Sequence, residues 1–237
     1  MKTIVWDLFG GLNGSVGLSL DPKIYKIYTI DILDETKDGR KNIVIDLADS
    51  ITMRLFAKLD KLPKPDIIVA SPMCQSFSRA AALKGGNASW RVNNDVITYR
   101  KPEDYINTRY NYTDQLDKAI LGETAIQNTI SIIRTYKPKH WYIENPASSL
   151  IWKLINYNWD FNHISNIADY SAYGFISKKP TIFLSNTLLD LKTSKQKSSI
   201  NTEQISQKQR SDIPKDLIRD IFDQFNNPRI IQPSLLN

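Results

Sequence analysis

Short apolar runs alternate with longer mixed segments along the first two thirds of the chain, and this alternation predicts a succession of strands and helices. Runs rich in β-branched and aromatic residues predict strands at residues 3–9, 25–32, 42–47, 66–70 and 140–143. Mixed segments predict helices at residues 15–20, from 49 or 50 to 59, and at 124–136, where isoleucines recur at helical spacing. Strands that alternate with helices are typical of a parallel sheet with helices on both faces.

The last third predicts additions to this sheet. Residues 164–170, 174–175 and 181–184 are expected to be strands, the last two as a candidate hairpin that gives an antiparallel edge. Residues 192–210 are polar and basic, as in a linker or mobile loop, and a final amphipathic helix is expected from 213 to about 225. The predicted fold class is therefore α/β, a doubly wound, mostly parallel sheet with an antiparallel edge strand.

Composition limits the number of domains, the cellular compartment and the kinds of partner that we expect. The 237 residues, 41% of them hydrophobic, suffice for one domain, and no run approaches the roughly 20 apolar residues of a membrane span. Asp7 interrupts the first apolar run, so we expect no signal peptide. The single cysteine fits a reducing cytoplasm. One cysteine and two histidines in the whole chain are too few to make a structural zinc site expected. The net charge of +6 suits a polyanionic partner without requiring one. We expect a cytoplasmic monomer without a metal.

Chemistry-bearing residues collect where the predicted strands end. In an open α/β sheet, ligands bind outside the carboxyl ends of the strands. Those ends carry a glycine-rich turn, several carboxylates and the only cysteine, namely Asp7, residues 10–14, Asp31, Asp46, Cys74 and Glu144. Each feature alone is weak, but the ordered set is hard to obtain by chance.

The glycine turn and two carboxylates are candidates for holding a nucleoside. Gly10, Gly11 and Gly14 let the backbone approach a ligand at a helix start, although an ordinary strand-to-helix turn explains them equally well. Asp31 lies about 20 residues further on, where an acidic side chain can accept hydrogen bonds from a ribose, or be a solvated strand end. Asp46 suits an adenine amino group, and a helix-capping role is equally plausible.

Cys74 is the strongest single candidate for a catalytic residue. A lone cysteine is more often a buried small hydrophobe than a nucleophile. Cys74, however, follows Ser71 and Pro72 just past an apolar strand, and the polar residues 75–79 come next. This context indicates a loop at the ligand edge of the sheet and favours the nucleophile.

Residues 85–121, called the insert below, interrupt the alternation. Basic and aromatic side chains are interleaved in it, among them Arg91, Arg100, Lys101, Arg109 and several tyrosines. Cationic and stacking groups together suit a nucleic acid. A solvated insertion with a few core tyrosines is nearly as good an interpretation.

Four segments, taken in order, resemble the cytosine-5 DNA methyltransferases. Residues 7–11 (DLFGG), 72–78 (PMCQSFS), 144–146 (ENP) and 173–175 (YGF) are similar to the family signatures DLFxGxGG, P-x-C-Q, E-N-V and Y-G-x-x-Q-x-R-x-R. Residues 210–214 and the helix after them resemble the last family motif, which completes the cofactor pocket. The resemblance covers about the whole chain, and its cysteine and glutamate motifs are the specific ones.

The resemblance implies a division of the chain and a cofactor. Residues 1–186 would form a methyltransferase domain of the S-adenosylmethionine-dependent type carrying the insert. Residues 187–210 would be a linker or reduced recognition loop, and 211–237 a helix returning to the cofactor pocket. The implied residues for S-adenosylmethionine are Phe9, Gly11, Leu12, Asn13, Gly14, Asp31, Ile32, Asp46, Leu47 and Pro72.

The resemblance also implies methyl transfer to carbon 5 of a cytosine flipped out of double-stranded DNA. Cys74 would add to carbon 6, and Glu144 would hydrogen-bond ring nitrogen 3 and the exocyclic amine. Lys179 or Arg79 would favour the thiolate. The residues expected to contact nucleic acid are Gln75, Ser78, Arg79, Lys84, Arg91, Arg100, Lys101 and Arg109.

Two departures from the family pattern keep other functions open. Ser177, Lys179 and Thr181 stand where the family has a glutamine and two arginines, and Lys179 keeps a charge but not the planar fork. The usual recognition region is also nearly absent. Our first interpretation is an active DNA methyltransferase with relaxed or short sequence recognition, encoded by a phage or mobile element without a restriction nuclease as partner. A transfer-RNA cytosine-5 methyltransferase and a catalytically weak cofactor- or nucleic-acid-binding module are the alternatives.

Overall fold

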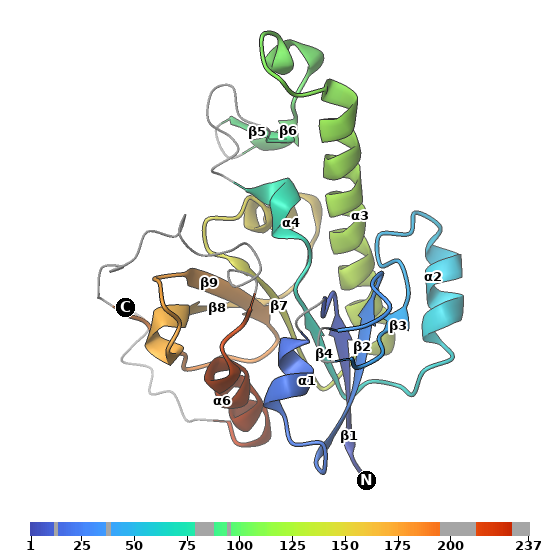
Figure 1. Cartoon of the computed structure of the whole chain (residues 1–237), viewed down its shortest axis with the longest axis vertical. Helices are drawn as coiled ribbons and strands as arrows, with labels where there is room; N and C mark the ends of the chain where they lie inside the picture. Colours follow the sequence, from blue (N-terminus) through green and yellow to red (C-terminus); the bar gives the residue numbers. More distant parts are fainter. Residues whose placement is uncertain (12–13, 37–38, 79–87, 94–95, 195–211, 229–237) are drawn as a thin grey trace.

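The computed structural model describes residues 1–11, 14–36, 39–78, 88–93, 96–194 and 212–228. Its centre is a seven-stranded sheet in the order β3-β2-β1-β4-β7-β9-β8 (Figure 1). The strands are β1 (Thr3–Leu8), β2 (Tyr25–Asp31), β3 (Ile43–Val44), β4 (Ile67–Ala70), β7 (His140–Pro146), β8 (Ile164–Asp169) and β9 (Pro180–Ser185). The first five pair in parallel, whereas β9 is antiparallel to both β7 and β8. The predicted fold class is confirmed.

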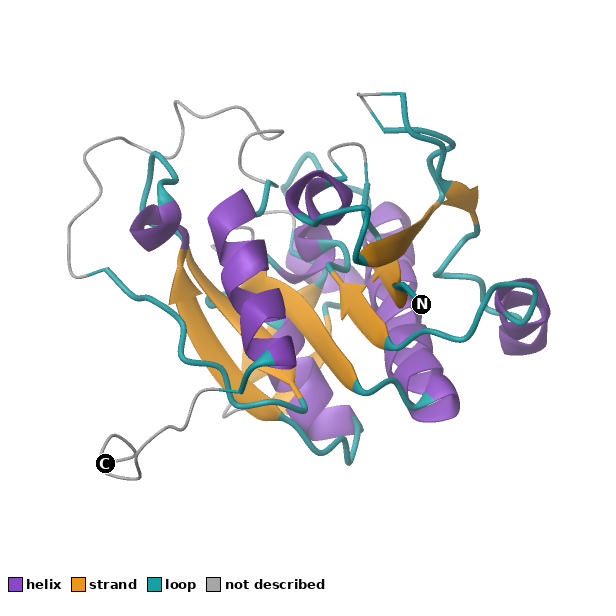
Figure 2. Ribbon diagram, turned by 90° about the horizontal axis from the view of Figure 1, so that it is seen from below, coloured by secondary structure: helices purple, strands orange, loops and turns teal. Residues whose placement is uncertain are grey.

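Helices cover both faces of this sheet (Figure 2). Alternate residues of the central strands enter two separate cores because successive side chains of a strand point to opposite faces. Trp6 and Ile68 pack on the side of α2 (Thr52–Leu59), α3 (Tyr112–Tyr136) and α4 (Ile151–Asn158). Val5 and Val69 pack on the side of α1 (Ser15–Ser19) and α6 (Lys215–Asn226). Among the described residues, no helix combines the length and apolarity needed to span a membrane.

The insert is largely structured. It contains an antiparallel hairpin of β5 (Trp90–Asn93) and β6 (Val96–Tyr99), and the first turns of α3. The sequence predicted this helix only from residue 124, but α3 begins at Tyr112. Asn111 caps it, because its side chain accepts a hydrogen bond from the Thr113 amide at 2.8 Å. The first turns bury Gln115, Ala119 and Gly122 rather than large apolar residues, so they lack the expected pattern.

One predicted strand is wrong. Residues 174–175 are not extended, because a 3₁₀ turn at Tyr170–Tyr173 ends in Gly174 with a left-handed φ of 83°. The candidate hairpin with residues 181–184 is therefore absent, and β9 instead pairs with β8 along its length. The antiparallel edge was predicted correctly, but the strand that pairs with residues 181–184 is β8 and not residues 174–175.

Candidate active site

Four parallel strands bring the candidate residues to one edge of the sheet. β1, β2, β4 and β7 run in the same direction, so their carboxyl ends lie together. Asp7, Asp31 and Glu144 are all buried at these ends, with exposures of 4, 8 and 7%. Cys74 lies just beyond β4, in a 3₁₀ turn at Cys74–Phe77, and its side chain is exposed. The sequence therefore located a cluster of buried carboxylates beside an accessible thiol.

Gly10 in the glycine turn leaves no room for a side chain. A Cβ on Gly10 would lie 2.4 Å from Cγ2 of Thr29 and 2.5 Å from Oδ2 of Asp7, both on buried side chains. Gly11 has a left-handed φ of 62°, and its amide donates to Oδ2 of Asp31 at 2.8 Å. Asp31 thus holds the turn against the end of β2. Of the nearby cofactor candidates, Leu12 and Asn13 lie outside the described residues.

Asp7 is an unusual buried acid. Burial, followed by the negative charge of Asp31, raises the pKa of Asp7 to about 7, against smaller opposing effects from Arg40 and Thr29. Its Oδ2 atom has no hydrogen-bond partner within the part of the chain that the structure describes. A donor or a positive charge at this position would therefore complement the carboxylate.

Arg40 belongs to this end of the site and was not predicted from the sequence. Its Nη2 donates to the carbonyl of Gly14 at 3.0 Å. A Cβ on Gly17 would lie 1.8 Å from Nη1, so the guanidinium lies directly against the backbone of α1. Gly14 at the N-cap and Gly17 in α1 leave the backbone bare on this side, which is the signal that the sequence offered.

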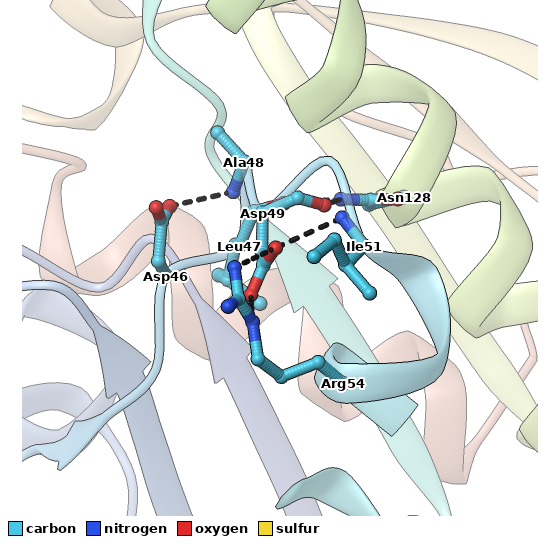
Figure 3. A network of polar contacts seen from close by, with 7 residues as sticks. All are labelled: Asp46, Leu47, Ala48, Asp49, Ile51, Arg54 and Asn128. Carbon is cyan, nitrogen blue, oxygen red and sulfur yellow. Dashed lines mark hydrogen bonds and ion pairs between the residues drawn. The ribbon is translucent and has the colours of Figure 1, made fainter. Parts of the chain in front are cut away.

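The loop after β3 is fastened to α3 (Figure 3). Asp49 accepts hydrogen bonds from Nε and Nη2 of Arg54 at 2.5 and 2.7 Å, and Arg54 lowers the pKa of Asp49 to about 2. Nδ2 of Asn128 bridges the carbonyls of Leu47 and Asp49 at 2.9 and 3.0 Å. Asp46 is exposed and accepts from the Ala48 amide at 2.9 Å. Asp46 therefore closes a turn, and the helix cap is Ile51, so the capping alternative for Asp46 is wrong.

Residues 72–78, called the nucleophile loop below, are held by the insert. Oγ of Ser76 donates to the Lys118 carbonyl in α3 at 2.9 Å. A Cβ on Gly122 would lie 2.8 Å from Cβ of Ser76, so glycine permits the close approach. Phe77 is fully buried, stacks on Trp90 of β5 and accepts a hydrogen bond from the Leu150 amide at 2.9 Å. The insert and the nucleophile loop are thus one packed unit.

Two contacts position Glu144. The Tyr170 hydroxyl donates to Oε1 of Glu144 at 2.9 Å, and Tyr170 is fully buried. Nδ2 of Asn145 donates to the Pro72 carbonyl at 2.8 Å and so ties the end of β7 to the nucleophile loop. Tyr170 was missed by the sequence analysis because it is 26 residues from Glu144 and outside the family signatures.

Opposite charges act on Cys74. Partial desolvation, followed by the negative charge of Glu144, raises the pKa of the Cys74 thiol, whereas the positive charge of Lys179 lowers it. Nζ of Lys179 lies 4.3 Å from the centre of the Tyr170 ring. Ser177 and Thr181, which stand at the other two departures from the family pattern, are buried. Lys179 is therefore the charged group of this segment that acts on the thiol.

The other predicted residues differ in their surroundings. Phe9 has a left-handed φ of 59°, Ile32 is exposed, and Leu47 and Pro72 are buried. Among the nucleic-acid candidates, Arg91 forms an ion pair with Asp104, and Arg109 donates to the Tyr110 hydroxyl at 3.0 Å. Gln75 and Lys101 are exposed, Ser78 and Arg100 are half-buried, and Arg79 and Lys84 lie outside the described residues. In the described part of the chain, no group of three or more metal-ligating side chains could hold a metal ion.

The charges around Cys74 give a measurable pH dependence. We expect iodoacetamide to alkylate the single cysteine with a midpoint above that of an ordinary thiol, because the reactive thiolate is disfavoured. Lys179→Gln removes a favourable positive charge and should raise the midpoint further. Glu144→Gln removes a negative charge and should lower it. Midpoints that stay unchanged or move in the same direction in both variants would contradict this arrangement.

Solved structures similar to this chain include three methyltransferases, each at a TM-score below 0.5. No family model and no curated protein matches the chain. A methyltransferase of Entamoeba histolytica matches at 14% identity and a TM-score of 0.46, over 86% of this chain and 62% of that one. The S. pombe Dnmt2 methyltransferase matches at 15% and 0.41, over 78% and 49%. A protein described as a DNA modification methyltransferase, encoded within an E. coli prophage, matches at 14% and 0.43, over 78% and 46%. This chain therefore spans less than two thirds of each of these proteins.

Proposed function

We propose that this protein is a DNA (cytosine-5) methyltransferase that uses Cys74 as its nucleophile. The observation that supports it most is the exposed thiol of Cys74 within electrostatic reach of both the buried Glu144 carboxylate and the Lys179 ammonium. A structural cysteine needs neither charge, whereas covalent catalysis on a cytosine needs a thiolate and an acidic partner for the ring.

The other end of the site fits S-adenosylmethionine. A Cβ at Gly11 would meet only the Phe9 carbonyl among the described residues, at 3.8 Å, so this part of the turn has room for a ligand. Asp7 offers a carboxylate oxygen without a partner among the described residues, which suits a ligand that carries positive charge. Asp31, whose two oxygens accept from the Gly11 and Leu33 amides, would use its remaining lone pairs for ribose hydroxyls. When bound, this cofactor supplies an electrophilic methyl group to carbon 5 of the base.

The chain's own residues would perform the remaining chemistry. The Cys74 thiolate adds its electron pair to carbon 6 of the flipped cytosine, and carbon 5 becomes enamine-like. Glu144, held by Tyr170, would act in its protonated form: it would donate to nitrogen 3, accept from the exocyclic amine, and so limit the negative charge that the addition places on the ring. When a water molecule takes the proton of carbon 5 as a base, the C–H electron pair would restore the double bond between carbons 5 and 6, the carbon–sulfur bond would break, and Cys74 would leave as a thiolate. Lys179 favours that thiolate at both steps.

Tritiated methyl transfer tests the proposal against its alternatives. We expect incorporation into unmethylated duplex DNA from labelled S-adenosylmethionine, with 5-methylcytosine as the product after hydrolysis. Incorporation into transfer RNA but not into DNA would identify the RNA enzyme instead. No incorporation into either would favour a binding module and reject catalysis.

A further inference from the structure

Residues 45–49, called the β3 turn below, leave the sheet at the edge where the candidate cofactor residues lie. β3 is parallel to β2, and the Ile45 amide donates to the Asp31 carbonyl at 3.0 Å, so the turn begins beside the end of β2. Asp46 is exposed in this turn, and its Oδ1 accepts from the Ala48 amide at 2.9 Å. Its Oδ2 accepts no hydrogen bond from the described residues, so one carboxylate oxygen is left for a ligand.

One buried amide fixes the shape of the β3 turn. Asn128 is 2% exposed, and its Nδ2 donates to the carbonyls of Leu47 and Asp49 at 2.9 and 3.0 Å. A primary amide carries two N–H donors, so a single side chain sets the positions of two backbone carbonyls. Asn128 and Asp46 lie on opposite sides of the turn (Figure 3), so the amide holds the turn from the side away from the exposed carboxylate.

The helix that carries Asn128 also contacts the nucleophile loop. Gly122 lies earlier in α3, and a Cβ there would be 2.8 Å from Cβ of Ser76. Oγ of Ser76 donates to the Lys118 carbonyl, one turn further along the same helix. Six residues of an α-helix rise about 9 Å, so the two contact points are close together on one continuous element. α3 therefore supports both the β3 turn and the loop that carries Cys74.

We propose that Asn128 is a positioning residue for the cofactor: by holding the β3 turn on α3, it sets where the Asp46 carboxylate meets the adenine amino group of S-adenosylmethionine. The inference rests on the proposed function and adds a residue that the sequence analysis did not single out. Without the amide, two backbone carbonyls lose their donor and the turn can shift relative to the helix. The hydrogen bond from the adenine amino group to the carboxylate would then weaken, because such bonds depend steeply on geometry.

Affinity for the nucleoside part of the cofactor tests this inference. Asn128→Asp replaces the NH₂ group by an acceptor oxygen of similar size, so at neutral pH neither carbonyl receives a hydrogen bond. We expect calorimetric titration to show a loss of affinity on the order of 10-fold, as for a lost hydrogen bond. The loss should be equal for S-adenosylmethionine and for 5′-methylthioadenosine, which lacks the amino-acid part, because both ligands carry the adenine. Asn128→Ala removes the donor without adding charge and should weaken both ligands in the same way.

Asn166 supplies a matched control for a purely structural amide. It is 3% exposed, and its Nδ2 likewise bridges two carbonyls, those of Phe183 and Thr187, each at 3.1 Å. It lies in β8, at the opposite edge of the sheet from β3 (Figure 1). Asn166→Asp should lower the melting temperature as Asn128→Asp does, but it should leave both affinities at the wild-type value. All titrations are run below the lowest melting temperature, so that folded proteins are compared.

The outcomes separate this inference from the proposed function. Equal losses of affinity in the Asn128 and Asn166 variants would overturn it, as would wild-type affinity in the Asn128 variants or a wild-type protein that binds neither ligand. The titrations need no nucleic acid and no turnover. If the wild-type protein transfers no methyl group but Asn128→Asp still selectively weakens both ligands, the proposed function fails and the role of Asn128 stands.

Discussion

Cys74→Ala is expected to abolish methyl transfer, with a loss on the order of 10⁴-fold or more, since it removes the nucleophile of a covalent mechanism. The chain has no second cysteine that could substitute. Duplex DNA that contains 5-fluorocytosine gives the direct measurement. Fluorine at carbon 5 cannot leave as a proton does, so the enzyme remains covalently bound and migrates as a larger species under denaturing conditions. The wild-type protein should form this adduct only when S-adenosylmethionine is present, and Cys74→Ala should form none.

Loss of folding must be distinguished from loss of the thiol. Cys74 is exposed and lies in a 3₁₀ turn, so its truncation should leave the melting temperature and DNA binding almost unchanged. Met73→Ala truncates the exposed neighbouring side chain and should still form the adduct. An adduct that persists in Cys74→Ala would remove this residue from the mechanism, whatever the enzyme methylates.

The sheet was predictable because its strands carry their own signal. The β-branched runs that become β1 and β4 are largely buried in the sheet, so most of their positions are apolar, whereas β2 also carries the exposed Lys26. β7 extends past the predicted end at residue 143 because Glu144 and Asn145 pair with β9 although they are polar. A polar strand end that faces a ligand site is hidden from a pattern of apolar residues.

The sequence points to the carboxylates of the candidate site, but not to the residues that hold them and their neighbours in place. Strand ends located Asp7, Asp31 and Glu144, because parallel strands end at one edge whatever the sequence between them. Gly122 and Tyr170 act through tertiary contacts, and no local pattern encodes which distant atom a small or buried residue approaches. Such supports become visible only when the chain is folded.

Tyr170→Phe should lower kcat about 10- to 100-fold, the equivalent of the roughly 1.5–3 kcal/mol that a hydrogen bond to a charged group contributes. The variant keeps the buried ring and removes only the hydroxyl that donates to Oε1 of Glu144 at 2.9 Å. Without that donor, Glu144 would be free to rotate away from the position in which we propose that it meets the base. The affinity for S-adenosylmethionine should stay unchanged, because the hydroxyl contacts Glu144 and not the glycine turn. Adduct formation with 5-fluorocytosine should slow in proportion to kcat.

Tyr173→Phe is the matched control, since it makes the same chemical change three residues away. The Tyr173 hydroxyl donates to Oδ2 of Asp220 in α6 at 2.8 Å and accepts from the Lys192 amide, so its loss should lower the melting temperature. A structural role for both tyrosines predicts similar losses of stability and equal kcat values. A positioning role for Tyr170 predicts that kcat falls in Tyr170→Phe alone. Equal kcat in the two variants would show that Glu144 does not need the hydrogen bond from Tyr170.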